Sequence, residues 1–149
     1  MKEITLTNED AKYSAAVLAK AINMESTADM DSEGKSKAVY RLGKAHGSIV
    51  SKLKSYNEHL ERLQEEHIKR DKKGEKVVAT TRAKNEETGE WEDRESGFEI
   101  TDPDLYLADI KAVSAETFKV ELPTIPLDWL EGNAALGFLA SACAYIIEE

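Results

Sequence analysis

An apolar repeat of nine positions is the feature that most restricts the fold of this chain. It consists of Val39, Leu42, His46, Ile49, Leu53, Tyr56, Leu60, Leu63 and His67, which are separated alternately by three and four residues. This spacing places all nine on one side of a helix and predicts one long helix over residues 35–73, as in coiled coils. We call these nine residues the seam.

A helix of this length needs cover along its whole seam. At about 1.5 Å per residue it is on the order of 55 Å long, which exceeds what any other predicted helix of the chain can cover. We therefore predict a homo-oligomer, and both parallel and antiparallel pairing fit the pattern. Its expected interface consists of Leu42, Ile49, Leu53, Tyr56, Leu60 and Leu63.

Shorter segments complete the predicted fold. Residues 3–7 alternate like a strand, and a helix begins after Thr7 or Asn8. Two β-branched or aromatic segments around the turn sequence "NEETGE" predict a β-hairpin arm over residues 75–100. Asp102 and Pro103 have the residue types that begin a helix.

Two further elements are expected near the C-terminus. "FKVELPTI" is a strand at a sheet edge or beside the opening strand, because its prolines cannot sit in a central strand. The small and apolar residues 133–147 predict a buried C-terminal helix. The expected fold is a single α+β domain over residues 1–149, with a long central helix, two or three further helices, a β-hairpin and a small antiparallel sheet.

Charge is unevenly distributed along the chain. The formal net charge is −9, yet residues 35–76 carry 12 basic and 6 acidic side chains. Duplex nucleic acid is not expected as a partner of so acidic a chain, because attraction to phosphates dominates that affinity. The basic segment suits attraction to an acidic part of the same or another chain, or binding of an anion.

Seven residues are candidate contacts for an anionic ligand such as a nucleotide. Arg41, Lys44, Lys52 and Lys54 belong to the basic segment, and Arg82, Trp91 and Arg94 belong to the predicted hairpin. An aromatic ring can stack on a base while guanidinium groups bind phosphate. The alternatives are a solvated helix face and ordinary cross-strand packing of Trp91.

Signatures of catalysis are missing from the sequence. It has no phosphate-binding loop, no H-E-x-x-H and no G-x-S-x-G, and the three histidines are dispersed. Cys143, the only cysteine, lies in an apolar run where a thiol behaves as a small hydrophobe. We expect no enzyme, cofactor or metal, and no membrane partner, because no run of ~18 apolar residues occurs.

The order of features resembles small proteins encoded by tailed bacteriophages. The resemblance lies in the opening "MKEITLTNED", a long basic helix ending in "RDKKGE", an acidic hairpin and a closing "VELP" strand. It implies a viral origin, and it carries no functional residue with it. Because the opening segment lacks the pattern of a signal peptide, we expect the protein in the cytoplasm, here that of the host cell.

Two kinds of function follow from this resemblance and from the charge pattern. The first is a host-defence antagonist that acts by binding, either masking a host protein or sequestering an anionic nucleotide signal. The second is a structural component used in virion or tail assembly. An unrecognised hydrolase is a further alternative.

Overall fold

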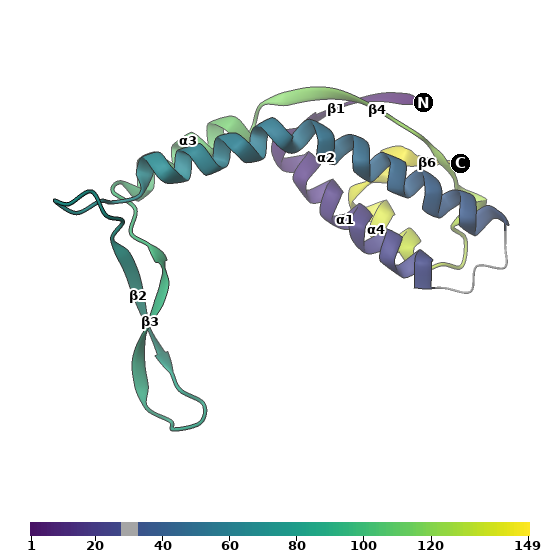
Figure 1. Ribbon diagram of the computed structural model, residues 1–149. Coiled ribbons are helices and arrows are strands. Elements are labelled where there is room, and N and C mark those ends of the chain that lie inside the picture. The colour runs from purple at the N-terminus through teal and green to yellow at the C-terminus, as the bar shows by residue number, and fades with distance from the viewer. Residues whose placement is uncertain (28–32) are drawn as a thin grey trace. The chain divides into compact units, whose positions relative to one another are not determined.

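The computed structural model describes residues 1–27 and 33–149. Its residues divide into two compact units, Met1–Asn57 with Ala112–Glu149, and Glu58–Lys111, where the sequence led us to expect one domain. The α+β class is confirmed (Figure 1).

The helices are α1 (Asn8–Thr27), α2 (Glu33–His67), α3 (Pro103–Ser114) and α4 (Ala135–Ala142), with 3-10 turns at Leu127–Trp129 and Ala144–Ile146. The strands are β1 (Lys2–Thr7), β2 (Val78–Lys84), β3 (Trp91–Phe98), β4 (Thr117–Leu122), β5 (Ile125–Pro126) and β6 (Ile147–Glu148).

The first unit is built around α1. Its N-terminus is capped by Thr7, whose Oγ1 accepts a hydrogen bond from the Asp10 backbone N–H at 3.0 Å. Ala11, Ala15, Leu18 and Ala21 follow at helical spacing and are buried, and α1 lies against α4 (Figure 1). The small alanines on this face permit close approach of the two helices.

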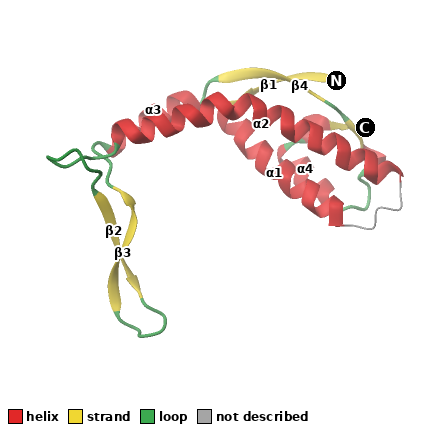
Figure 2. Ribbon diagram, viewed as in Figure 1, coloured by secondary structure: helices red, strands yellow, loops and turns green. Residues whose placement is uncertain are grey.

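A two-stranded antiparallel sheet in the first unit pairs the N-terminal strand with the strand that follows α3. β1 pairs with β4 from Lys2 opposite Leu122 to Thr7 opposite Thr117, as the sequence predicted for the opening strand. Ile125 and Ile147 form a short parallel pair, β5 with β6. Figure 2 shows the strands of these pairs in yellow.

The seam of α2 is covered by the chain itself. Five of the six residues predicted to form an oligomer interface are buried within this one chain, and the sixth, Leu60, is partly buried. The five are Leu42, Ile49, Leu53, Tyr56 and Leu63. Tyr56 also forms a buried hydrogen bond with Ser114, 2.7 Å between Oη and Oγ. These five side chains thus belong to the core of this chain, and self-association through the seam stays a prediction.

Two predicted helix boundaries are also corrected. α2 ends at His67 rather than near residue 73, because the backbone from Ile68 to Arg70 pairs with Ile100 and Lys76 in β-bridges. The C-terminal helix covers only Ala135–Ala142, because Cys143 leaves helical geometry with φ −131° and ψ 31°. Its buried side consists of Ala135 and Leu139, so it is not buried all round.

No helix within residues 1–27 and 33–149 is long and apolar enough to span a membrane.

From the burial along the seam we predict different stability effects at two neighbouring positions of α2. Ile49 is 0% exposed and Val50 is 44% exposed. Ile49→Ala should lower the free energy of unfolding by about 2–5 kcal/mol, because it leaves a cavity in the core. Val50→Ala should change it by less than about 0.5 kcal/mol. Urea unfolding of both variants measures the difference, and equal losses would contradict burial of the seam by this chain.

Candidate functional site

The hairpin of the second unit is held at its base by backbone hydrogen bonds. The Lys69 N–H donates to the Glu99 carbonyl at 2.8 Å, and the Lys69 carbonyl accepts from the Val77 N–H at 2.9 Å. Beside them, the Thr101 N–H donates to the His67 carbonyl at 2.8 Å, and Ile68 is buried. This base junction fixes both ends of the hairpin to the last turn of α2.

A tight turn brings the chain from α2 into the hairpin. Asp71 Oδ1 accepts hydrogen bonds from the Lys73 and Glu75 backbone N–H groups, at 2.8 and 3.0 Å. Gly74 has a φ of 80°, which a residue with a side chain adopts at a cost. The "DKKGE" sequence is therefore a turn, as expected.

The hairpin itself contains only β2 and β3, and these two strands pair with each other and with no other strand in the described chain (Figure 2). Lys84 lies opposite Trp91 and Val78 lies opposite Phe98, with a β-bulge between Ala79 and Thr80. All eight residues of β3 are exposed. An isolated two-stranded ribbon is marginally stable in water, so this one depends on its base junction and on any partner it contacts.

The large apolar side chains of the hairpin share one face. Directly opposed residues of an antiparallel pair lie on the same face, and successive residues alternate. The Trp91 face therefore carries Val78, Thr80, Arg82, Lys84, Trp91, Asp93, Glu95 and Phe98. On it, Trp91 is 62% exposed, Phe98 43% and Val78 41%. The opposite side, the Arg94 face, carries Ala79, Thr81, Ala83, Glu92 and Arg94.

This alternation separates three predicted ligand contacts. Arg82 shares the Trp91 face and lies 3.9 Å from Asp93, whereas Arg94 is on the other face and donates to Glu92 at 2.9 Å. Both guanidinium groups are thus beside a carboxylate of the same hairpin. The predicted platform of Trp91 with both arginines does not form on a single face.

The four predicted contacts of the basic segment are also dispersed. Arg41 donates to the Thr124 carbonyl at 2.7 Å and stacks over the Trp129 ring at 4.7 Å, so it has a structural role. Lys44 and Lys52 line one open groove of about 470 Å³. The residues that line this groove do not include Lys54.

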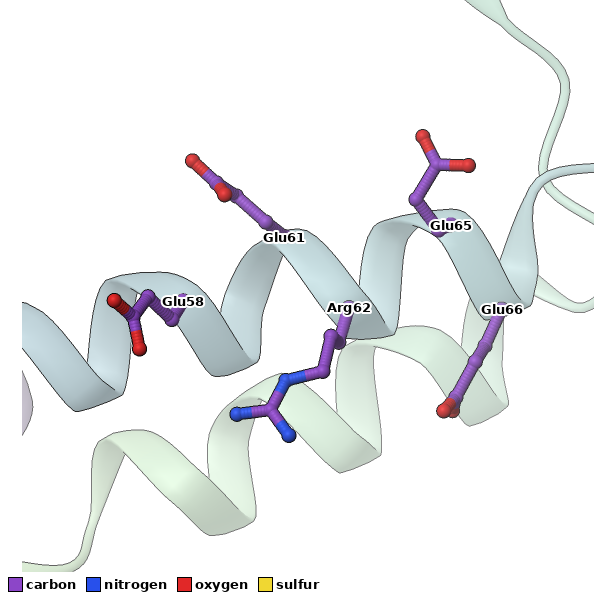
Figure 3. Close-up of a pocket in the computed structure, with 5 residues that line it drawn as sticks. All are labelled: Glu58, Glu61, Arg62, Glu65 and Glu66. Atoms are coloured by element: carbon purple, nitrogen blue, oxygen red, sulfur yellow. The ribbon is translucent and has the colours of Figure 1, made fainter.

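A second surface hollow, of about 670 Å³, lies along the last part of α2 and is acidic. Figure 3 shows Glu58, Glu61, Arg62, Glu65 and Glu66 around it, with Glu61 and Glu65 on one side of the helix and Arg62 and Glu66 on another. A hydrogen bond from Lys76 lowers the pKa of Glu65. The carboxylates do not converge, and the part of the chain that the structure describes holds no group of three potential metal ligands.

His67 has a partner in the second unit. Its Nε2 lies 2.9 Å from Asp109 Oδ2, and its ring is 5.2 Å from the Tyr106 ring. This pair joins α2 to α3. A histidine oriented by a carboxylate can act as the general base of a nucleophilic site. Among the described residues, however, no hydrogen bond joins His67 to a serine or a cysteine.

Cys143 belongs to a buried polar cluster in the first unit. The Tyr145 hydroxyl donates to Ser14 Oγ at 2.7 Å, Ser14 Oγ donates to the Ala142 carbonyl at 3.3 Å, and the thiol lies 3.7 Å from the Ser14 carbonyl. Burial raises the pKa of the Cys143 thiol and raises that of Tyr145 to about 12. Both groups stay protonated at neutral pH, which suits packing rather than nucleophilic attack.

No family model matches this sequence, and neither a curated protein nor a solved structure matches it. What can be proposed about function therefore rests on the chain's own residues. Sequence reasoning missed the Ser14–Tyr145–Cys143 cluster, because Ser14 lies far from the other two residues in the chain. It also missed the shared face of Val78, Phe98 and Trp91, because the β-bulge between Ala79 and Thr80 shifts the alternation along β3.

The partly buried phenol of Tyr145 leads us to predict a pH dependence of stability. Its pKa in the fold, about 12, exceeds the ordinary value of 10.0, so its contribution is complete below pH 10 and is lost between pH 10 and about 12. Tyr145→Phe should lower stability by about 1 kcal/mol at pH 7 through the lost hydrogen bond to Ser14. The difference in the free energy of unfolding between this variant and wild type should then decrease as the pH rises through that range.

Urea unfolding between pH 7 and 12 measures this effect. The matched control is Tyr13→Phe, because Tyr13 is exposed. A wild-type advantage that stays constant up to pH 12 would contradict the burial of the phenol.

Proposed function

We propose that this chain is a non-enzymatic accessory protein of a bacteriophage that antagonises a host factor by binding and masking a protein surface. The phage origin rests on the sequence resemblance. The Trp91 face of the hairpin is the proposed contact. We also propose that the chain acts inside the host cell and without a cofactor.

One observation carries the proposal: three large apolar side chains lie exposed on one face of a ribbon. Trp91, Phe98 and Val78 are each more than two-fifths exposed. Tryptophan is enriched among the residues that dominate binding energy at protein interfaces, and burying such side chains is strongly favourable. The base junction holds the strands in a defined register before any partner arrives, which lowers the entropy cost of binding.

Masking a protein has more support than sequestering a nucleotide. Sequestration needs several cationic groups around an enclosed site. Arg41, Arg82 and Arg94 each have a partner within the fold, and the groove that holds Lys44 and Lys52 is open. A ribbon face that exposes Trp91, Phe98 and Val78 among charged side chains suits another protein.

A structural component of the virion or tail is the second candidate function. The same face, with unpaired strand edges on both sides of the ribbon, also suits stacking into an assembly. An unrecognised hydrolase has less support, because the protonated Cys143 and Tyr145 lack the character of nucleophiles.

Photo-crosslinking at the Trp91 face tests this proposal. Benzoyl-phenylalanine is placed at Trp91 in the full-length protein, produced during infection by the phage that encodes it, and the crosslinked species are identified by mass spectrometry. We expect one discrete protein adduct. The matched control carries the same group at Tyr40, which is 70% exposed but lies on α2.

The identity of the adduct separates the candidates. A host protein supports masking, and a virion protein, with the chain present in purified particles, supports assembly. Val78→Thr with Phe98→Thr should abolish the adduct, because threonine keeps strand propensity while removing apolar area. Thr81→Val on the Arg94 face should preserve it. Equal adducts from Trp91 and Tyr40, or none from Trp91, would contradict the proposed contact.

A further inference from the structure

We propose that the groove between α2 and β4 is a docking site for the acidic strand β3 of a second copy of this chain. The groove is lined by Lys44, Gly47, Ser48, Ser51 and Lys52 of α2 and by Val120 and Glu121 of β4. We call it the α2–β4 groove. This self-association goes beyond the proposed function, because its groove lies outside the Trp91 face and its partner is a second copy of the chain.

The shape of the α2–β4 groove suits an extended segment. Its volume is about 470 Å³, and its helical wall presents small residues, Gly47, Ser48 and Ser51, between two lysines. A side chain built at Gly47 would meet no atom within 4 Å. The space above this turn of α2 is therefore open to a partner.

The second wall of the groove comes from an edge strand. β4 pairs only with β1 in its sheet, so one edge of β4 has no strand partner in the described chain. Open edges of this kind accept an added extended strand, with backbone hydrogen bonds giving affinity and side chains giving specificity. A helix beside such an edge restricts which strand can enter.

The helical wall of the groove is basic, and the β4 wall contributes the carboxylate Glu121. Residues 35–57 contain six basic and no acidic side chains. Within the part of the chain that the structure describes, no carboxylate lies in ion-pair distance of Lys44 or Lys52. Two cations on one wall of a groove favour an anionic occupant.

The chain itself carries an occupant of the required kind. Residues 85–99 contain seven acidic side chains and one basic, and all of β3 is exposed. β3 is extended and also has one unpaired edge. The Glu90 and Glu95 carboxylates have no ion pair among the described residues, so they are free to meet Lys44 and Lys52. Each copy thus supplies both a basic groove and an acidic strand, which can close a symmetric assembly.

Filling the groove is the first test. Gly47→Gln adds a side chain where there is open space, and it also replaces a helical glycine, so the fold should be retained or stabilised. Gly43→Gln is the matched control. Gly43 also has open space around it, does not line the groove, and would direct its side chain toward the preceding turn of α2.

Sedimentation velocity of the full-length protein over a range of concentrations gives the result. We expect wild type and Gly43→Gln to self-associate, more weakly at 0.5 M salt than at 0.05 M, because screening weakens the charge attraction. Gly47→Gln should weaken self-association by about tenfold or more. Thermal melting verifies that each variant is folded. Monomeric wild type at all concentrations, or self-association of Gly47→Gln equal to that of Gly43→Gln, would overturn the proposal.

A charge exchange identifies the occupant. Lys44→Glu with Lys52→Glu reverses the two lysines of the groove, and Glu90→Lys with Glu95→Lys reverses the two carboxylates proposed to meet them. Each double variant alone should remain monomeric through like-charge repulsion, and an equimolar mixture should associate. If the groove variant is monomeric but the strand variant associates like wild type, the occupant is not β3, and the proposal fails. A Trp91 adduct between two copies of this chain would belong to this self-association, whereas an adduct with another protein tests the proposed function, so the two failures are distinguishable.

Discussion

Apolar packing along α2 from Ala38 to Tyr56 is the interaction on which the first unit depends. Ala38, Leu42, Ala45 and Ile49 are all fully buried, and the buried Leu53 and Tyr56 continue the same side of the helix. Removing this much apolar surface from water supplies the main driving force for folding such a unit. With its seam so occupied, α2 presents its polar and basic side to solvent, and that side forms one wall of the α2–β4 groove.

Local features of the fold could be predicted from sequence, and nonlocal ones could not. The turn at Asp71 and the pairing of Val78–Lys84 with Trp91–Phe98 depend on neighbouring residues, so their patterns were sufficient. The end of α2 was misplaced because Lys69 bonds to Glu99 and Val77, which local periodicity does not reveal. A heptad pattern predicts that a seam is buried but does not specify which chain buries it.

The candidate site likewise has local features that the sequence could predict and nonlocal ones that it could not. Alternation along the hairpin would have placed Arg82 and Arg94 on opposite faces, so this separation was present in the sequence. The contacts of Arg41 could not be predicted from the sequence, because its partners Thr124 and Trp129 lie more than eighty residues away. Charge totals predicted a basic segment correctly. Charge totals could not show that, of the four predicted contacts in this segment, Lys44 and Lys52 line a common groove.

The base junction has an evolutionary consequence. Its bonds join main-chain atoms of His67, Lys69, Val77, Glu99 and Thr101, and main-chain atoms are the same whatever the side chain. Exposed positions farther along the ribbon can therefore change identity without loosening its attachment, apart from proline, which lacks the N–H. A hairpin attached in this way can vary its exposed side chains by substitution while its register is maintained.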